Sequence, residues 1–467
     1  MLKAQFGMIG LGTMGRNLVL NIAEHGFAVC GYDPDVAQQQ RMIDESSGKP
    51  VTVAKSLQEL VDQLEKPARV MLLVPAGKIV DAVLADLTPL LQKDDIVIDG
   101  GNSHFIDTDR RYSELQKTGI HFMGMGVSGG EEGARFGPSM MPGSNIESYN
   151  AVKNILEAVA AKTDDGPCVS FIGNGAAGHY TKMVHNGIEY AIMQLISEVY
   201  GILRNEAGVT NDELQIIFGA WNKTVLQSFL IEITADIFGK LDDKGDGYLV
   251  DKILDKAKQK GTGMWTSQSA MDLNVPIPVI DAAVSMRYLS SMKEERVAAS
   301  KNYSISKVNA EVNSIALVNT CQKALEFGFM ISYAQGLELL LKASQAFNYN
   351  VSIAEVLRIW QGGCIIRSAM LKDLRKAYLN NDSLENIITD ADFAEQLSIG
   401  RNAAAALCQV GLYASAPVAG FSAAVNYFDA YRSEILPVNL IQAQRDLFGA
   451  HTYERIDASG TFHTDWK

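Results

Sequence analysis

The chain has 467 residues, of which 47% are hydrophobic and 20% are charged, and its formal net charge is −13. This length predicts two or more domains, and the composition is that of a soluble globular protein. The negative charge argues against nucleic acid and against an anionic membrane surface as partners. Neither a leader pattern nor an apolar run of roughly 20 residues is present, so we expect a cytoplasmic protein.

The first third of the chain alternates short apolar runs with amphipathic segments. The apolar runs predict strands over residues 6–9, 28–32, 70–74, 96–99, 121–125 and 169–172. Helical patterns lie between several of them, such as residues 16–25 and 78–91. This alternation is typical of a mostly parallel sheet with helices on both faces. We therefore predict an α/β domain over residues 1–176.

A glycine-rich segment joins the first predicted strand to the first predicted helix. Its residues are Gly10, Leu11, Gly12, Thr13, Met14 and Gly15. In this context the first glycine permits a tight turn, the second lets the backbone approach a pyrophosphate, and the third lets helix and strand pack closely. Amides at the helix N-terminus would bind the phosphate. The segment predicts a dinucleotide site.

A carboxylate follows the second predicted strand. It is Asp33, in Tyr32-Asp33-Pro34, and no Lys or Arg follows it until Arg41. A carboxylate there accepts hydrogen bonds from the ribose 2′-hydroxyl of NAD and repels the 2′-phosphate of NADP. These residues predict NAD as the coenzyme.

From about residue 177 to about residue 434, apolar residues recur at helical spacing, which predicts an all-helical second domain. Its first long segment places Lys182, His185, Asn186 and Glu189 at i, i+3, i+4 and i+7. At about 100° per residue these four side chains share one helix face. A solvated stripe is the alternative, but the flanking residues are mostly apolar. Buried Lys and Glu are rare unless they are paired or functional.

The helical half also predicts an internal duplication. The dipeptide at 189–190 and Trp221 are matched by the dipeptide at 326–327 and Trp360 at similar spacing. In this register the second copy lacks the polar face, because Lys182, His185 and Asn186 fall opposite Asn319, Gln322 and Lys323.

The remaining features concern the cysteines and the end of the chain. Five widely spaced cysteines form no CxxC pair, so we expect reduced thiols, no zinc site and no disulfide framework. Residues 435–467 lack a long amphipathic pattern and contain Pro437, Gly449 and Gly460. A tail of this length needs a surface to lie on.

Several ordered motifs resemble those of the decarboxylating 6-phosphogluconate dehydrogenases, and the resemblance covers essentially the whole chain. These motifs are residues 98–103, 127–135, 182–189, 260–266, 359–364 and 442–453. The family implies a Rossmann-type coenzyme domain, a large helical domain, and a tail that threads into the partner subunit of a homodimer. It implies oxidation of 6-phosphogluconate at C3, loss of CO2 and protonation of the enediol to ribulose 5-phosphate, without a metal.

The resemblance also implies roles for individual residues. Lys182 resembles the general base that takes the proton of the C3 hydroxyl, and Glu189 resembles the acid that protonates C1 of the enediol. The implied substrate ligands are Asn102, Ser128, Gly129, Gly130, His185, Asn186, Tyr190, Lys260, Thr262 and Arg287, with Arg445 and His451 of the partner subunit. The coenzyme residues are Gly10, Leu11, Gly12, Thr13, Met14, Gly15, Tyr32, Asp33, Pro34, Val74, Pro75, Ala76, Asn102 and Glu131.

Three departures from the family pattern concern the coenzyme. Many members carry Asn-Arg-Thr at residues 32–34 and Lys at Pro75, and Gly12 replaces a commoner Ala. Exchanging a cation for an anion beside a phosphate should change binding by several kcal/mol. We therefore predict NAD, with an NADP-dependent form of the same enzyme as the alternative.

Two other classes of protein remain as alternatives. β-Hydroxyacid dehydrogenases share the coenzyme domain and a Lys on the first long helix, but they are shorter and lack the duplication and the tail. Turnover of unphosphorylated gluconate would favour that class. Coenzyme binding without CO2 release would favour a non-catalytic dinucleotide-binding paralogue.

Overall fold

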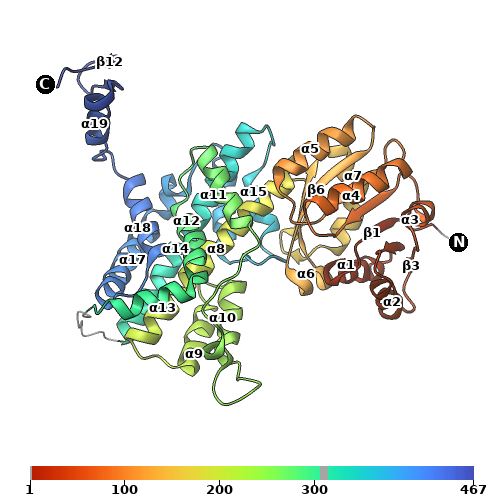
Figure 1. Ribbon diagram of the computed structural model, residues 1–467, viewed down its shortest axis with the longest axis horizontal. Helices are drawn as coiled ribbons and strands as arrows, with labels where there is room; N and C mark the ends of the chain where they lie inside the picture. Colours follow the sequence, from red (N-terminus) through yellow and green to blue (C-terminus); the bar gives the residue numbers. More distant parts are fainter. Residues whose placement is uncertain (1–2, 306–313, 467) are drawn as a thin grey trace.

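The computed structural model describes residues 3–305 and 314–466. Figure 1 shows an α/β domain beside a larger helical domain, with the C-terminal segment projecting from the far end of the helical domain. The predicted fold class, a Rossmann-type α/β domain followed by an all-α domain, is confirmed.

One sheet organises the first domain, and its strand order is β10-β7-β6-β5-β4-β1-β2-β3. Every neighbouring pair is parallel except β6 with β7. The chain order reverses between β1 and β4, which is where such sheets open a crevice for ligands. The strands are β1 (Phe6–Ile9), β2 (Val29–Tyr32), β3 (Val51–Val53), β4 (Arg69–Leu72), β5 (Ile96–Asp99), β6 (His121–Ser128), β7 (Ser139–Ser144) and β10 (Gly173–Asn174).

Helices cover both faces of this sheet because successive strand residues point to opposite sides. Phe6 and Met8 pack with α1 (Thr13–Glu24) and α7 (Ile146–Val159), and α6 (Gly130–Phe136) lies against α1. Ile9 packs on the other face with α3 (Leu57–Gln63), α4 (Lys78–Leu87) and α5 (Phe105–Gln116). A further helix, α2 (Val36–Glu45), follows β2.

The structure corrects one predicted strand. Residues 169–172 form no strand, and only Val169 makes an isolated bridge, with Met140. The reason is local, because the Val169 amide donates to the carbonyl of Pro167. The strand that joins the sheet is β10, immediately after that run. A separate pair, β8 (Lys162–Thr163) and β9 (Gly166–Pro167), forms a small antiparallel hairpin.

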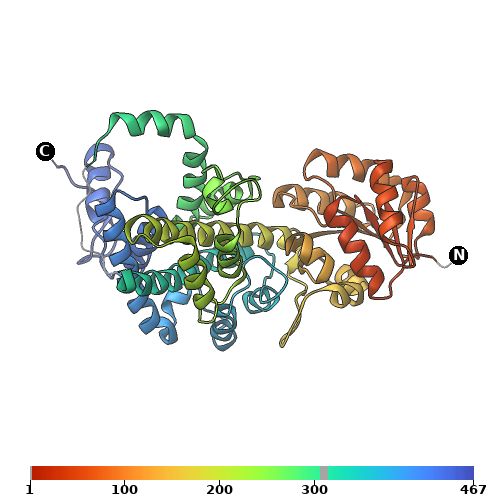
Figure 2. The same ribbon diagram turned by 90° about the horizontal axis from the view of Figure 1, so that it is seen from below.

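Two long helices, α8 (Ala177–Glu206) and α14 (Ser314–Ala346), pack together at the centre of the helical domain (Figure 2). In the described part of the chain, no helix is both long and apolar enough to cross a membrane. The other helices are α9 (Asn211–Trp221), α10 (Phe229–Gly239), α11 (Thr262–Asp272), α12 (Pro278–Ser291), α13 (Lys293–Asn302), α15 (Ile353–Ile359), α16 (Met370–Asn380), α17 (Ala394–Ala414) and α18 (Ala419–Tyr431).

The order of helices supports the predicted duplication, since α8, α9 and α10 are followed by the similar series α14, α15 and α16. Equivalent buried side chains also cap helices of the opposite copy. Glu198 on α8 accepts hydrogen bonds from the Gly420 and Phe421 amides at the start of α18, at 2.7 and 3.0 Å. Gln335 on α14, which falls opposite Glu198 in the predicted register, accepts from the Val279 amide of α12 at 3.1 Å.

The tail contains a helix that its sequence pattern did not predict, α19 (Asn439–Gly449), followed by a hairpin of β11 (Tyr453–Glu454) and β12 (Thr461–Phe462). The buried Asp446 carboxylate holds this unit together. It accepts from the amides of Thr452 and Thr464 and from the Trp466 indole, and it lies 2.9 Å from His463 Nδ1. Burial alone would raise the Asp446 pKa, but these donors hold it below its ordinary value.

Candidate active site

The predicted coenzyme residues lie in loops that follow the carboxyl ends of β1, β2, β4 and β5 and at the start of α6. Gly10 has a φ of 96°, which favours glycine. A Cβ added to Gly15 would lie 1.9 Å from the Gly10 carbonyl oxygen, so this glycine allows close packing of helix on strand. A Cβ on Gly12 would meet no described heavy atom within 4 Å. The open approach at Gly12 fits a bound pyrophosphate.

Asp33 is fixed at the rim of this crevice. Its Oδ2 accepts from the Leu11 amide at 2.7 Å, and its Oδ1 accepts from the Asp35 amide at 2.9 Å. The carboxylate therefore lies directly beside the glycine-rich segment. Its neighbour Tyr32 is partly buried and Pro34 is exposed.

The other predicted coenzyme residues surround the same segment. Val74 lies beside Gly10, since a Cβ added there would be 3.1 Å from Val74 Cγ1. Pro75, Ala76 and Thr13 are exposed, and Met14 is partly buried. Glu131, on α6, accepts a long hydrogen bond of 3.5 Å from Asn17 on α1, which places it near the start of that helix.

The polar face of α8 is buried, as its apolar flanks predicted. Lys182 is 7% exposed and His185 is 0% exposed. Lys182 Nζ lies 3.4 Å from His185 Nδ1, which lies 3.2 Å from Asn186 Oδ1 and 3.9 Å from Glu189 Oε2. The four predicted side chains therefore form one cluster.

Burial changes the pKa values of this cluster in useful directions. It lowers the pKa of Lys182, although the nearby Glu189 opposes the shift. It raises the pKa of Glu189, against the effect of Lys182 and Arg287. His185 has a pKa well below its ordinary value because of burial and the adjacent Lys182. A lysine that loses its proton easily and a carboxyl that keeps its proton suit a base and an acid.

The predicted carboxylate cradle adjoins this cluster. Ser128 Oγ, at the end of β6, lies 3.2 Å from His185 Nε2. Gly129 and Gly130 have φ values of 116° and 63°, in the region that favours glycine. A Cβ added to Gly129 would lie 2.6 Å from the Gly363 carbonyl oxygen. The loop therefore packs against the predicted motif at residues 359–364.

The predicted phosphate ligands of the same chain gather one turn further along α8. The Arg287 guanidinium, on α12, stacks over the Tyr190 ring at 3.5 Å from its centroid. Thr262 is buried at the start of α11, and a Cβ added to Gly263 would lie 2.6 Å from the Tyr190 ring. Lys260 is exposed in the segment that leads into α11. The Arg287 guanidinium and the start of α11 thus both lie against Tyr190.

Three other predicted substrate ligands are exposed, whereas the cluster on α8 is largely buried. Asn102 is exposed in the loop after β5. Arg445 and His451 are exposed in the tail, where Arg445 donates to Gln442 Oε1 at 3.0 Å. Figure 1 shows the tail projecting away from α8, α11 and α12.

Three residues without a role assigned from the sequence join elements around the site. Thr266 Oγ1 donates to the Met183 carbonyl at 3.0 Å and ties α11 to α8. Trp360 packs edge-on against His185, with ring centroids 5.6 Å apart. Trp265 packs against His104 of the coenzyme domain at 4.7 Å. All three lie in or beside the sequence motifs, which were the only signal available.

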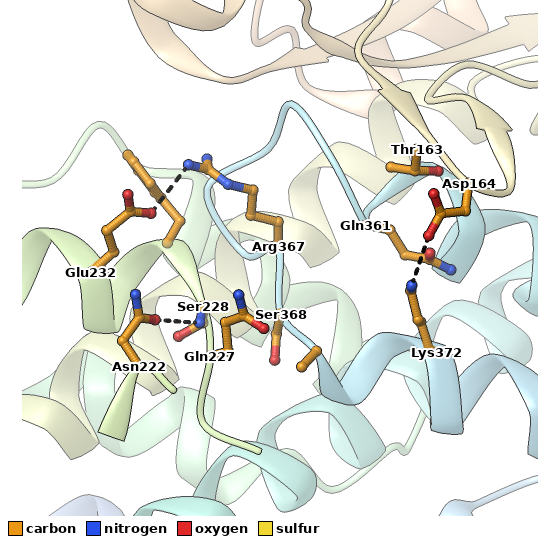
Figure 3. Close-up of a pocket in the computed structure, with 12 residues that line it drawn as sticks. Thr163, Asp164, Asn222, Gln227, Ser228, Glu232, Gln361, Arg367, Ser368 and Lys372 are labelled. Atoms are coloured by element: carbon orange, nitrogen blue, oxygen red, sulfur yellow. Dashed lines mark hydrogen bonds and ion pairs between the residues drawn. The ribbon is translucent and has the colours of Figure 1, made fainter. Parts of the chain in front are cut away.

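A cavity of about 430 Å³ lies outside this site, where the two helical copies meet (Figure 3). The Phe229 amide donates to the Arg367 carbonyl there, and the Ala369 amide donates to the Gln227 carbonyl. Its charged side chains are paired, Arg367 with Glu232 and Lys372 with Asp164. None of the residues that line it belongs to the predicted site.

Metal ligation has no support in the described residues. Residues 3–305 and 314–466 contain no group of three or more His, Cys, Asp or Glu side chains placed to hold a metal ion. The five cysteines are buried, free thiols.

Comparison with known proteins assigns the family. The model described as "NAD binding domain of 6-phosphogluconate dehydrogenase" matches residues 5–173, and the model described as "6-phosphogluconate dehydrogenase, C-terminal domain" matches residues 178–466. The chain is 48% identical to a decarboxylating 6-phosphogluconate dehydrogenase of Lactococcus lactis, covering 100% of this chain and 99% of the relative. It is 49% identical to the NADP(+)-dependent, decarboxylating enzyme of Bacillus subtilis, over 100% of both chains.

A solved structure shows the same architecture over the whole chain. It is the 6-phosphogluconate dehydrogenase of Plasmodium falciparum, described in its apo form, with its cofactor NADP+ and with its substrate 6-phosphogluconate. The TM-score is 0.96 at 40% identity, covering 99% of this chain and 100% of that one. Matching motifs, fold and family models together show that the chain belongs to the decarboxylating 6-phosphogluconate dehydrogenase family.

Proposed function

We propose that this chain oxidises 6-phosphogluconate at C3, releases C1 as CO2 and forms ribulose 5-phosphate. The observation that carries the proposal is the buried face of α8, where Lys182 and Glu189 have pKa values shifted toward one another. The adjoining Ser128 loop would bind the carboxylate of the substrate, and the Arg287–Tyr190 pair would bind its phosphate.

The residues act in sequence on one bound sugar acid. Neutral Lys182 accepts the proton of the C3 hydroxyl, and a bound nicotinamide coenzyme supplies the acceptor for the C3 hydride. The Lys182 ammonium then donates a hydrogen bond to the C3 carbonyl oxygen, which stabilises negative charge there as the bond to the carboxylate breaks. Glu189 donates its proton to C1 of the enediol, numbered as in the ribulose 5-phosphate product. His185, Asn186 and Asn102 would hold hydroxyl groups.

Both ends of the substrate are anionic, so this acidic protein must gather hydrogen-bond donors and cations around each of them. Ser128, Gly129 and Gly130 would hold the carboxylate through their hydroxyl and backbone amide groups. The phosphate would be bound by Tyr190, Lys260, Thr262 and Arg287, with Arg445 and His451 of the partner subunit. We therefore propose a homodimer in which the tail of each chain completes the site of the other. The predicted location is the cytoplasm.

Two observations bear on the coenzyme and favour different choices. The names of the B. subtilis relative and of the P. falciparum structure favour NADP. The NAD preference has no support from these comparisons and rests on Asp33 and Pro75. The Asp33 carboxylate lies 2.7 Å from the Leu11 amide, where it would repel a 2′-phosphate. The ratio of kcat/KM for NADP to that for NAD decides between them, and a ratio above one would refute the NAD prediction.

The reaction itself is tested with 6-phosphogluconate labelled at C1. Release of labelled CO2 should match formation of reduced coenzyme one to one, and ribulose 5-phosphate should accumulate. Lys182→Met and Glu189→Gln should each lower kcat strongly while the protein stays folded. Equal turnover of unphosphorylated gluconate would instead favour a β-hydroxyacid dehydrogenase. Coenzyme binding without CO2 release would favour a non-catalytic protein.

A further inference from the structure

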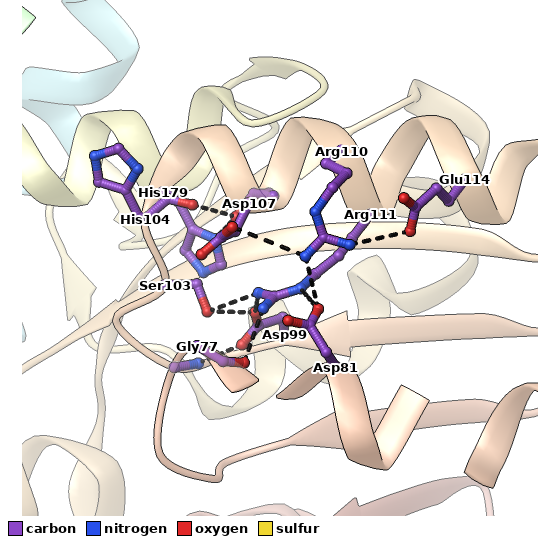
Figure 4. A network of polar contacts seen from close by, with 12 residues as sticks. Gly77, Asp81, Asp99, Ser103, His104, Asp107, Arg110, Arg111, Glu114 and His179 are labelled. Carbon is purple, nitrogen blue, oxygen red and sulfur yellow. Dashed lines mark hydrogen bonds and ion pairs between the residues drawn. The ribbon is translucent and has the colours of Figure 1, made fainter. Parts of the chain in front are cut away.

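A buried arginine lies beneath two loops that carry predicted coenzyme residues (Figure 4). Arg111, on α5, is 0% exposed. It occupies the inward face of α5, together with Phe105, Thr108 and Leu115. An arginine that is buried on the inward face of a helix requires partners for its charge.

The guanidinium contacts both loops at once. Arg111 Nη2 donates to the Gly77 carbonyl at 3.0 Å, directly after residues 74–76. Its Nη1 donates to Ser103 Oγ at 3.3 Å and to Asp99 Oδ2 at 3.4 Å, on either side of Asn102. Nε donates to Asp81 Oδ1 at 2.8 Å. One planar group therefore joins the chain after β4 to the chain after β5.

The second loop is organised around the same group. Asp99 Oδ2 accepts from Ser103 Oγ at 2.6 Å, and Asp99 Oδ1 accepts from the Gly101 amide at 3.0 Å. The Arg111 guanidinium also lowers the pKa of Asp81 to about 2, with help from Arg110. Two carboxylates balance the charge of Arg111. Asp99 stands at the start of the loop at residues 99–103, and Asp81 lies in the first turn of α4. A lysine ammonium is a single point and could not reach all these acceptors together.

We propose that Arg111 is a positioning residue that fixes the loop at residues 74–77 relative to the loop at residues 99–103, so that both face the coenzyme in one geometry. Arg111 itself touches neither coenzyme nor substrate. The inference rests on the proposed function, because it takes these loops to be the coenzyme loops.

The test compares Arg111→Lys with Arg110→Lys in the full-length protein. Arg110 is the matched control, since it also pairs with Asp81, at 2.8 Å, but is exposed and contacts neither loop. Dissociation constants for NADH and NADPH are measured by fluorescence without substrate, and unfolding midpoints are measured in parallel. We expect Arg111→Lys to weaken binding of the preferred coenzyme about tenfold or more, and Arg110→Lys to change it less than about twofold.

A second variant removes the Ser103 hydroxyl, which accepts from Arg111 and donates to Asp99, and leaves Arg111 and Asp99 paired with each other. Ser103→Ala should weaken coenzyme binding about twofold to fivefold, and this effect should become smaller in the Arg111→Lys background because the two residues share the contact between the Arg111 guanidinium and the Ser103 hydroxyl. A purely structural role would lower the unfolding midpoint and leave the dissociation constants unchanged. Dissociation constants within twofold of wild type for folded Arg111→Lys overturn the proposal, and if that variant does not fold, the same result for Ser103→Ala overturns it.

Failure of the proposed function can be distinguished from failure of this inference. Coenzyme binding is measured without 6-phosphogluconate, so a wild-type protein that binds coenzyme but does not turn over that substrate still tests Arg111. In addition, kcat and KM for 6-phosphogluconate are measured for Arg111→Lys. They should show whether a displacement of Asn102 in this variant mainly weakens substrate binding or mainly slows turnover.

Discussion

Lys182 and Glu189 lie on the same face of α8, and burial acts on their pKa values in opposite directions. Burial disfavours the charged form of each group, which is the ammonium of lysine and the carboxylate of glutamate. The sequence was enough to predict that these side chains share a face. Both side chains approach His185 on the same helix, but the groups that surround this cluster come from elements distant in the sequence, including Ser128 of β6 and the segment around Cys364.

The lowered pKa of Lys182 predicts a specific pH dependence. Log kcat/KM should rise with pH until Lys182 is neutral, and it should level off below the ordinary lysine pKa. Lys182→Met should reduce kcat by about 10²- to 10⁴-fold, as expected for loss of a general base. The measurement is a pH profile of initial rates. A flat profile for the wild type would contradict the assigned role.

The same shift predicts how stability depends on pH. Between the lowered folded-state pKa of Lys182 and its ordinary value, the unfolded chain binds more protons than the folded chain. The free energy of unfolding should therefore increase with pH across that interval. Lys182→Met should remove this increase, measured by urea denaturation at several alkaline pH values. Parallel curves for the two proteins would show that burial does not shift this group.

Asp33 allows a prediction that holds whichever coenzyme the wild type prefers. Asp33→Asn removes the negative charge while its amide oxygen can still accept from the Leu11 amide. The ratio of kcat/KM for NADP to that for NAD should rise about tenfold or more, because a like-charge contact is lost. Steady-state kinetics with both coenzymes measure the ratio. Asp35→Asn is the control, since the Asp35 carboxylate accepts from the Ala37 amide at the start of α2, and an equal change in both variants would contradict the role of Asp33.

At the scale of elements, the duplicated copies support each other through helix caps. Gln335 on α14 supports α12, which carries Arg287, through the buried Val279 amide. Gln335→Met should lower the free energy of unfolding by about 1–3 kcal/mol, because that amide loses its acceptor. Chemical denaturation measures the change. Gln409→Met, on the exposed side of α17, should change stability little, and similar losses in both variants would argue against the cap.

The strands show where a sequence pattern is sufficient and where it is not. The runs at β1 and β5 were predicted with the bounds that the structure has, because they are apolar and buried on both faces. The run at 169–172 looked similar, but a local turn took up its first amide. The strand β7 was not predicted, since Pro142 and Gly143 conceal its pattern. Residues 139–144 form a strand because they pair with β6, and this pairing cannot be predicted from the sequence of the segment alone.

At the scale of the whole molecule, the tail needs a surface that its own chain does not provide. Its exposed apolar side chains include Ile435, Leu440, Ile441, Leu447 and Phe448. The tail also carries Arg445, on α19, and His451, which follows it, and Figure 1 shows α19 projecting away from α8, α11 and α12. Exposed apolar area of this kind is typical of an interface. The proposed homodimer would account for both features.

Exchange of tails between subunits predicts complementation between two inactive proteins. Lys182→Met and Arg445→Met should each have little activity alone. If the two chains pair at random after co-expression, half of the dimers contain one chain of each kind. Each of these mixed dimers has one intact site out of two, so activity should reach about a quarter of wild type. The control pair Lys182→Met with Glu189→Gln damages the same site from one chain and should not recover. Absence of recovery in the first pair would mean that the tail serves its own subunit.

The sequence by itself determined the two-domain fold class, the glycine-rich turn, the shared polar face of α8 and the family. The turn and the polar face depend on residue spacing within one segment, which local backbone geometry converts directly into structure, and the fold class and the family depend on the order of such segments along the chain. The tertiary structure decided the rest: the shifted pKa values of Lys182 and Glu189, the helix caps between copies, the burial of Arg111 under two loops and the free-standing tail. These depend on which distant segments meet, and on the solvent they exclude when they do.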